Sequence, residues 1–168
     1  MNKKIAIFGH REIAKGDNLE ISVNKIFVQN INNGNKCFLF GSRSKFNDLC
    51  YNIILQLQKE YSDIKKVGYL CSNEIAFTLE EKLRYEKYNS RYENIKTYEE
   101  IKQFEFENRN LYIERNKKMI DDADICVFYY KKSLLNPQNK FGYKTKSGTQ
   151  IALEYAKLKN KEIIIINK

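Results

Sequence analysis

Short apolar runs alternate along the chain with stretches in which apolar residues recur every three or four positions. The short runs are typical of buried β-strands, and the wider spacing is typical of amphipathic α-helices. The predicted strands span residues 4–8, 36–40, 64–71, 92–96, 124–130 and 162–166. The predicted helices span residues 19–31, 50–61, 78–90, 109–123 and 147–158. Alternation of strands and helices indicates a parallel sheet with crossover helices, and hence an α/β fold.

The length of 168 residues fits one domain, and no repeat, linker or low-complexity segment interrupts the pattern. We expect residues 1–168 to form a single domain, a Rossmann-like three-layer sandwich with a mainly parallel central sheet. The first apolar run, residues 5–8, is too short for a signal peptide, and no run approaches the roughly 20 residues of a membrane helix. The sequence predicts a soluble, cytoplasmic protein with no membrane partner.

The chain carries a formal net charge of +9, which permits an anionic partner. However, the lysines are spread along the whole chain and form no dense basic run. This distribution favours a solvated surface over a nucleic-acid interface, which stays the weaker alternative.

Cysteine and histidine content gives little support for a metal site. None of the cysteines forms a Cys-x-x-Cys pair, and three of the four lie in apolar, strand-like runs. The four residues are Cys37, Cys50, Cys71 and Cys126. We expect buried, reduced thiols. The single histidine excludes a histidine-rich metal site, and we expect no metal and no cofactor.

The first predicted strand is followed by Gly9, His10 and Arg11. In an open parallel sheet the strand-to-helix junctions lie at one edge, where ligands bind. Gly9 permits a tight turn and a close approach of the backbone to a ligand. Arg11 can hold a phosphate or carboxylate through two hydrogen bonds, and His10 can donate to a phosphate or act as a general base. The alternative is a surface loop whose histidine only packs.

The second junction contains Gly41, Ser42, Arg43, Ser44 and Asp48, and it opens directly into a helix. A helix N-terminus presents free N–H groups and a partial positive charge, so it binds phosphate. The two serines add hydroxyl donors, and Asp48 either caps a turn or holds a ribose hydroxyl. The alternative is an ordinary N-capped helix. The glycine and lysine spacing of a P-loop is absent.

The third junction contains Lys146, Ser147, Gly148 and Thr149, directly before the last predicted helix. Small hydroxyl residues and a glycine again expose N–H groups at a helix start, and the lysine favours an anion. The alternative is a plain serine or threonine cap.

Two further pairs belong to the candidate site. Arg115 and Asn116 lie in a helix whose apolar face points at the sheet, so they can reach the ligand from the side; the alternative is a surface arginine. Tyr129 or Tyr130, at the end of the buried strand 124–130, can stack on a base.

Taken together, these segments resemble the SLOG superfamily, the Rossmann-like group that includes the DprA and LOG proteins, and in particular its YpsA-like branch. The likeness covers nearly the whole chain. The matching residues are Gly9-His10-Arg11, Gly41 through Asp48, Arg115-Asn116 with Met119 and Asp121, residues 124–130, and Ser147-Gly148-Thr149 with Tyr155-Ala156. Phe40, Ser147 and either Lys45 or Phe46 stand where the branch has glycine, which implies a bulkier and more basic pocket.

The resemblance implies a sensor or binding module that captures a nucleotide or a nucleotide-derived, phosphate-bearing ligand at the C-terminal edge of the sheet. Arg11, Arg43 and the N-termini of two helices would hold the phosphates. Related folds commonly pair through helix faces, so we also expect a homo-oligomer.

A nucleotide N-glycosidase or phosphoribohydrolase is the first alternative. LOG phosphoribohydrolases and the similar nucleoside deoxyribosyltransferases place a catalytic glutamate where this chain has Ile151 and Ala152. Glu154 lies two or three residues further along the helix, a rotation of about 200–300°, so it should face solvent. Asp48 or His10 would have to supply the catalytic group. The second alternative is a single-stranded nucleic-acid binder like the DprA proteins, which draws on the net charge.

Overall fold

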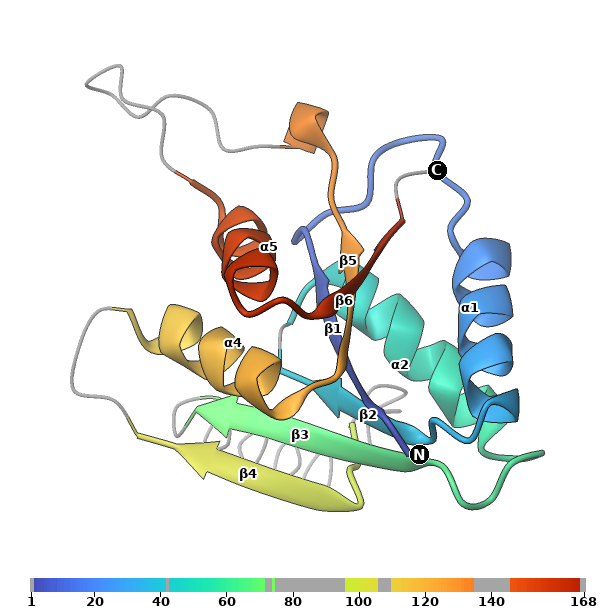
Figure 1. Ribbon diagram of the computed structural model, residues 1–168. Helices are drawn as coiled ribbons and strands as arrows, with labels where there is room; N and C mark the ends of the chain where they lie inside the picture. The colour runs from blue at the N-terminus through green and yellow to red at the C-terminus, as the bar shows by residue number, and fades with distance from the viewer. Residues whose placement is uncertain are drawn as a thin grey trace, which may run out of the picture.

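The apolar runs fold into one parallel sheet. The computed structural model describes residues 2–41, 43–71, 74, 96–105, 110–134 and 146–166. Within them, six parallel strands follow the order β4-β3-β2-β1-β5-β6 (Figure 1). The strands are β1 (Lys4–Gly9), β2 (Cys37–Phe40), β3 (Lys65–Cys71), β4 (Glu100–Phe104), β5 (Ile125–Tyr129) and β6 (Glu162–Ile166). The helices are α1 (Glu20–Asn32), α2 (Lys45–Leu57), α4 (Leu111–Asp122), α5 (Gly148–Leu158) and the short 3₁₀ helix η1 (Lys132–Leu134).

Helices cover both faces of the sheet (Figure 1). α1 and α2 pack on the face that receives Ile5 and Ile7 of β1, and α4 and α5 pack on the face that receives Ala6 and Phe8. Successive side chains of β1 therefore point to opposite faces, as the two-residue period of a strand requires. The α/β, Rossmann-like three-layer sandwich predicted from the sequence is confirmed, and every described strand pairing is parallel.

The chain changes its direction of travel across the sheet beside β1. From β1 it moves outward through β2, β3 and β4, and it then returns to the other side of β1 to form β5 and β6. The loop after β1 leads to a helix on one face, and the loop after β5 leads to a helix on the other. The two loops diverge and leave a crevice at the carboxyl ends of these strands, which is where open parallel sheets bind ligands.

The structure differs from the predicted elements in two places. α2 begins at Lys45 rather than at residue 50, because Ser44 caps it there. The sequence pattern does not predict β4, since this edge strand alternates between half-buried and exposed residues and has no continuous apolar run. The predicted helix 78–90 and nearly all of the predicted strand 92–96 lie outside the described residues.

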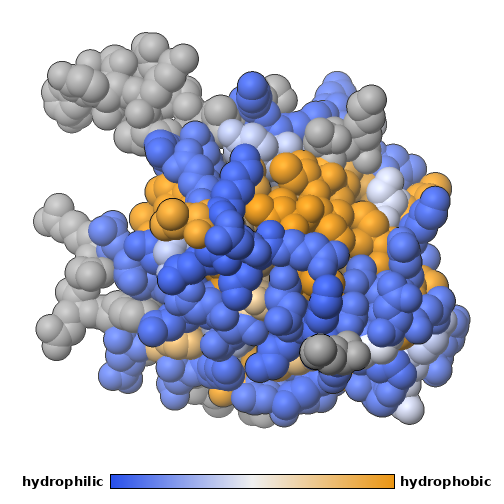
Figure 2. All heavy atoms as spheres, viewed as in Figure 1, coloured by the Kyte–Doolittle hydropathy of each residue, from blue (hydrophilic) through white to orange (hydrophobic). Residues whose placement is uncertain are grey.

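β6 is an edge strand with an unusually apolar sequence. Residues 163–166 are all isoleucine, which is typical of a strand buried on both faces. Among the described strands, however, β6 pairs only with β5, and Ile165 is 44% exposed. Figure 2 shows an apolar area on this side of the molecule. An apolar run therefore identifies a strand without fixing its place in the sheet.

The cysteines are buried free thiols, as expected. Burial raises the pKa of Cys126 to about 12 and that of Cys71 to about 11, so both thiols stay protonated and unreactive at neutral pH. None of the described helices has the length and apolar character needed to cross a membrane.

Gly9 and Gly41 allow close packing at the ends of β1 and β2. A Cβ at Gly9 would lie 2.6 Å from Cγ of Phe46, and a Cβ at Gly41 would lie 2.5 Å from the sulfur of Met119. Among the described glycines, a positive φ occurs only at Gly16 and Gly34. Gly9 therefore makes room for Phe46 in the first turn of α2. The tight turn expected after β1 does not require a positive φ at Gly9.

Replacing Gly9 with alanine should lower the free energy of unfolding by about 1–3 kcal/mol, because the new methyl group overlaps the Phe46 side chain. Urea denaturation followed by circular dichroism measures the change. Gly148→Ala is the matched control: a Cβ there meets no atom within 4 Å, so this variant should be as stable as the wild type or up to about 1 kcal/mol more stable. Equal destabilisation by the two substitutions would contradict the packing role of Gly9.

Candidate functional site

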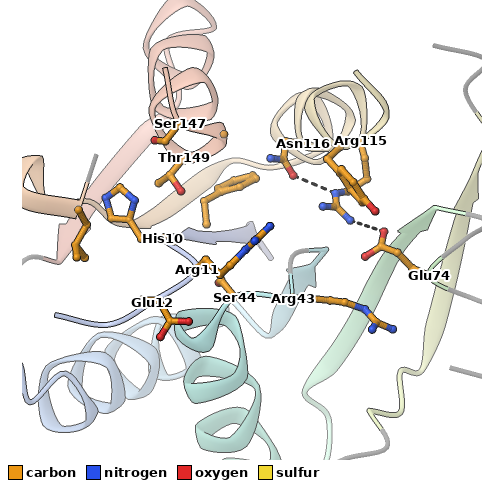
Figure 3. Close-up of a pocket in the computed structure, with 15 residues that line it drawn as sticks. His10, Arg11, Glu12, Arg43, Ser44, Glu74, Arg115, Asn116, Ser147 and Thr149 are labelled. Atoms are coloured by element: carbon orange, nitrogen blue, oxygen red, sulfur yellow. Dashed lines mark hydrogen bonds and ion pairs between the residues drawn. The ribbon is translucent and has the colours of Figure 1, made fainter. Parts of the chain in front are cut away.

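A cavity of about 680 Å³ opens at the carboxyl edge of the sheet (Figure 3). It is lined by the end of β1, the start of α2, the first turns of α4 and the start of α5. The three predicted strand-to-helix junctions and the Arg115-Asn116 pair therefore surround one space. The predicted residues that line it are Gly9, His10, Arg11, Arg43, Ser44, Arg115, Asn116, Ser147, Gly148 and Thr149.

Serine side chains cap the two helices that start at this edge. The Ser44 hydroxyl accepts a hydrogen bond from the N–H of Asn47 (3.1 Å), and the Ser147 hydroxyl accepts one from the N–H of Gln150 (3.1 Å). Each hydroxyl thus satisfies a backbone donor of its own helix, which is the capping alternative considered for both junctions. Both serines line the cavity, and their hydroxyls cap the helices at the same time.

The start of α5 still offers backbone donors to the cavity. The N–H groups of Gly148 and Thr149 make no hydrogen bond with any residue that the structure describes. At the start of α2, by contrast, the N–H of Lys45 donates to the carbonyl of Arg11 (2.9 Å). Because N–H groups without a partner and the helix dipole both favour negative charge, the start of α5 is better suited to an anion than the start of α2.

Arg11 and Arg43 have different orientations. In Figure 3 the Arg11 side chain extends into the middle of the cavity, whereas the Arg43 side chain points away from it. The Arg11 side chain makes no hydrogen bond or ion pair with another described residue. Glu12, which also lines the cavity, forms an exposed ion pair with Lys45 (2.5 Å). Arg11 is therefore the arginine that is placed to meet a ligand.

Arg115 has a structural role that the sequence did not reveal. Its Nη1 donates to the carbonyl oxygens of Gly41 and Tyr69 and to Oε1 of Glu74 (2.7 Å), and its Nε donates to Oδ1 of Asn116 (3.0 Å). Arg115 is 3% exposed, so this is a buried cation and not a surface arginine. It connects α4 to the ends of β2 and β3. The amide oxygen of Asn116 is taken up by this bond, which leaves its amide nitrogen turned toward the cavity (Figure 3).

Glu74 is the main residue of the cavity that sequence analysis missed. It is 6% exposed, pairs with Arg115 and accepts a hydrogen bond from the N–H of Cys71 (3.0 Å). The sequence feature that could have identified Glu74 is its position three residues after β3, because the end of β3 lies at the same edge of the sheet as the three junctions. The other lining residues that were not among the predicted site residues are Phe8, Glu12, Tyr112 and Leu134.

His10 is a buried, neutral imidazole. Its Nε2 accepts a hydrogen bond from the N–H of Lys131 (3.0 Å), and its ring stacks on Tyr130 at 5.5 Å between centroids. Burial lowers the pKa of His10 below its usual value. The bond to Lys131 assigns the proton to Nδ1. In this arrangement the Lys131 N–H occupies the lone pair that a general base would use, which favours the alternative role of His10 as a hydrogen-bond donor.

The two tyrosines predicted to stack on a base have other partners. Tyr129 is 0% exposed, its ring stacks on Phe46, and its hydroxyl donates to Asp17 (2.8 Å). Its side chain belongs to the α1/α2 face of the sheet, so its predicted stacking role is wrong. Tyr130 packs its ring against His10 and does not line the cavity.

The remaining predicted residues lie beside the cavity rather than in its wall. Asp48 forms an ion pair with Lys96, and Lys146 forms an exposed one with Glu154 (2.6 Å). Gly41 does not line the cavity, and its carbonyl oxygen accepts a hydrogen bond from Nη1 of Arg115. Ser42 lies outside the described residues.

Comparison with known proteins supports the fold. No family model and no curated protein matches the chain. Among solved structures, the chain is similar to the X-ray structure of TM1055, a Northeast Structural Genomics Consortium target. The two share 12% sequence identity with a TM-score of 0.52, over 96% of this chain and 72% of that one. At this identity the likeness shows the Rossmann-like fold alone.

The His10 resonance should titrate with a midpoint below pH 6.5, because burial disfavours the charged imidazolium. Since His10 is the only histidine, its ring proton is unambiguous in an NMR titration. A lowered folded-state pKa means that the unfolded chain takes up the proton first. The associated stability is therefore present above about pH 6.5 and is lost as the pH falls through the lowered pKa. In the His10→Asn variant, the free energy of unfolding should depend less on pH between pH 7 and 5.5 than it does in the wild type. A titration midpoint of His10 at or above pH 6.5 would show that the ring is not buried as described.

Arg115→Met should lower the free energy of unfolding by about 3–5 kcal/mol, because it leaves Glu74 buried without its cation and the Gly41 carbonyl without its donor. Lys117→Met, on the same helix, is the matched control. Lys117 forms a half-exposed pair with Glu114 (3.3 Å), so its loss should cost less than about 1 kcal/mol. Urea denaturation measures the free energy of unfolding of both variants. A similar loss of stability in the two would rule out the connecting role of Arg115.

Proposed function

We propose that this chain binds a nucleotide or a nucleotide-derived, phosphate-bearing ligand in the cavity, as a SLOG-type sensor or binding module of the YpsA-like branch. One observation carries the proposal. The N–H groups of Gly148 and Thr149, which bind no described residue, and the side chain of Arg11 belong to a single cavity at the point where the strand order reverses.

The polar groups of the cavity wall are mostly hydrogen-bond donors. Arg11, the two backbone N–H groups at the start of α5, the amide nitrogen of Asn116 and Nδ1 of His10 all donate. The oxygens of an ionised phosphate accept hydrogen bonds and donate none, so the donors of the wall and the phosphate of the ligand are complementary. The volume of about 680 Å³ falls within the roughly 300–1,000 Å³ of small-molecule sites.

The two acidic residues in the described part of the wall do not cancel this positive character. Glu74 is paired with Arg115, and Glu12 is paired with Lys45. Arg11 has no acidic partner among the described residues. The uncompensated charge that faces a ligand is therefore the guanidinium of Arg11, supported by the helix dipole of α5.

Binding accounts for this site better than the two alternatives do. Asp48, the carboxylate favoured for hydrolysis, lies outside the cavity in an ion pair with Lys96, and Glu74 is engaged by Arg115. Glu154 is exposed and pairs with Lys146, away from the cavity wall. For a nucleic-acid binder we would expect a long basic groove, whereas the donors here gather around a cavity of nucleotide size.

Arg11→Gln should weaken binding of a nucleoside monophosphate about 10- to 100-fold, the usual effect of losing a charged hydrogen bond. Isothermal titration calorimetry against a panel of nucleoside mono-, di- and triphosphates measures this. Lys15→Gln is the matched control, because Lys15 lies on the same loop, carries the same charge and does not line the cavity. It should bind as the wild type does.

Equal losses in the two variants would mean that the loop acts through general charge and not through contact at Arg11. Absence of binding across the whole panel, to the wild-type protein, would overturn the proposed function.

A further inference from the structure

We infer that Tyr112 is the surface on which the base of the ligand stacks, and that the ligand lies with its phosphate at the start of α5 and its base beside α4. This inference rests on the proposed function and adds the orientation of the ligand and the residue that reads its aromatic part. Neither the resemblance nor the comparisons assign a role to Tyr112.

The first argument is exposure. Three described residues of the cavity wall carry rings: Phe8, His10 and Tyr112. Phe8 is 2% exposed and His10 is 5% exposed, so neither has a face available to a ligand. Tyr112 is 49% exposed, and it is one of the few large hydrophobic side chains among the described residues that are so accessible. Of these three rings, Tyr112 is the most accessible to a ligand.

The second argument is the rigidity of the ring. Tyr112 lies in the first turn of α4, one turn before Arg115, whose guanidinium carbon lies 5.4 Å from the centroid of the ring. Arg115 is itself held by Glu74 and by the Gly41 carbonyl. The cation next to Tyr112 therefore has a fixed position, which limits the rotation of the tyrosine. A tyrosine ring that is held before binding loses little conformational entropy when a base stacks on it.

The third argument is the separation of two chemical environments. The start of α5 supplies N–H donors and a helix dipole, which suit a phosphate. The start of α4 supplies an exposed aromatic ring beside a cation whose charge is already compensated, which suits a base and not a second phosphate. Asn116, next to Arg115 in the chain, turns its amide nitrogen toward the cavity (Figure 3), where it can donate to the oxygens of a sugar.

The chain contains no tryptophan, which makes a fluorescence test direct. Tyr112→Trp places a single tryptophan in the cavity wall, and its emission should be quenched when a base stacks on it. The probes are the four 5′-nucleoside monophosphates, with ribose 5-phosphate as the ligand that has a phosphate and sugar but no base. Leu158→Trp is the control: Leu158 is 75% exposed at the far end of α5 and does not line the cavity. We expect quenching by at least one nucleotide in Tyr112→Trp, none by ribose 5-phosphate, and none by either in Leu158→Trp.

Affinity measurements separate stacking from a structural role. Tyr112→Leu should weaken nucleoside monophosphate binding about 5- to 100-fold, the range found for loss of one stacked base, and should leave ribose 5-phosphate binding unchanged. Tyr112→Phe keeps the ring and should bind both ligands as the wild type does. Equal weakening of both ligands in Tyr112→Leu would mean that Tyr112 only shapes the cavity, and would overturn the inference.

The two proposals fail in different ways. If ribose 5-phosphate and the nucleotides bind the wild type equally well, without quenching in Tyr112→Trp, the inference about Tyr112 is overturned and the phosphate site stands. If no phosphate ligand binds the wild type at all, both the proposed function and the inference are overturned.

Discussion

The buried guanidinium of Arg115 is the interaction on which the candidate site depends. It connects α4 to the carbonyls at the ends of β2 and β3, and its charge requires the buried carboxylate of Glu74. An unpaired charge in this position would be strongly destabilising, so the two residues form a unit that sets the wall of the cavity. An acidic residue in an otherwise donor-rich cavity is therefore explained by the protein's own cation, and it does not argue against an anionic ligand.

Most of the polar groups at this edge of the sheet serve the fold before they serve a ligand. Ser44 and Ser147 cap helices, and the N–H of Lys45 binds the Arg11 carbonyl. These contacts fix the positions of the loop after β1 and of the starts of α2 and α5. They do not involve the Arg11 side chain or the first N–H groups of α5. The groups that face the cavity are consequently few, and the contacts of their neighbours hold them in place.

The sequence predicted the fold and the gathering of the three junctions at one edge of the sheet, because both follow from topology. Alternating strands and helices imply a parallel sheet, and a parallel sheet brings its strand-to-helix junctions to one edge. Individual roles were less predictable. Tyr129 and Tyr130 are adjacent in sequence and point to opposite sides of β5, and packing decides which partner each one meets. Nothing in the sequence around Arg115 indicates that its charge is buried, since that depends on Glu74, which follows a different strand.

The hydrogen bond between the Lys45 N–H and the Arg11 carbonyl has a consequence for how a ligand is captured. The backbone of Arg11 is attached to the first turn of α2 before any ligand arrives. Binding of the proposed anionic ligand would therefore immobilise one side chain, at about 0.5–1.5 kcal/mol, instead of a whole loop at about 1–2 kcal/mol for each residue. Association with that ligand should then be limited by diffusion and desolvation and not by a slow rearrangement of the polypeptide.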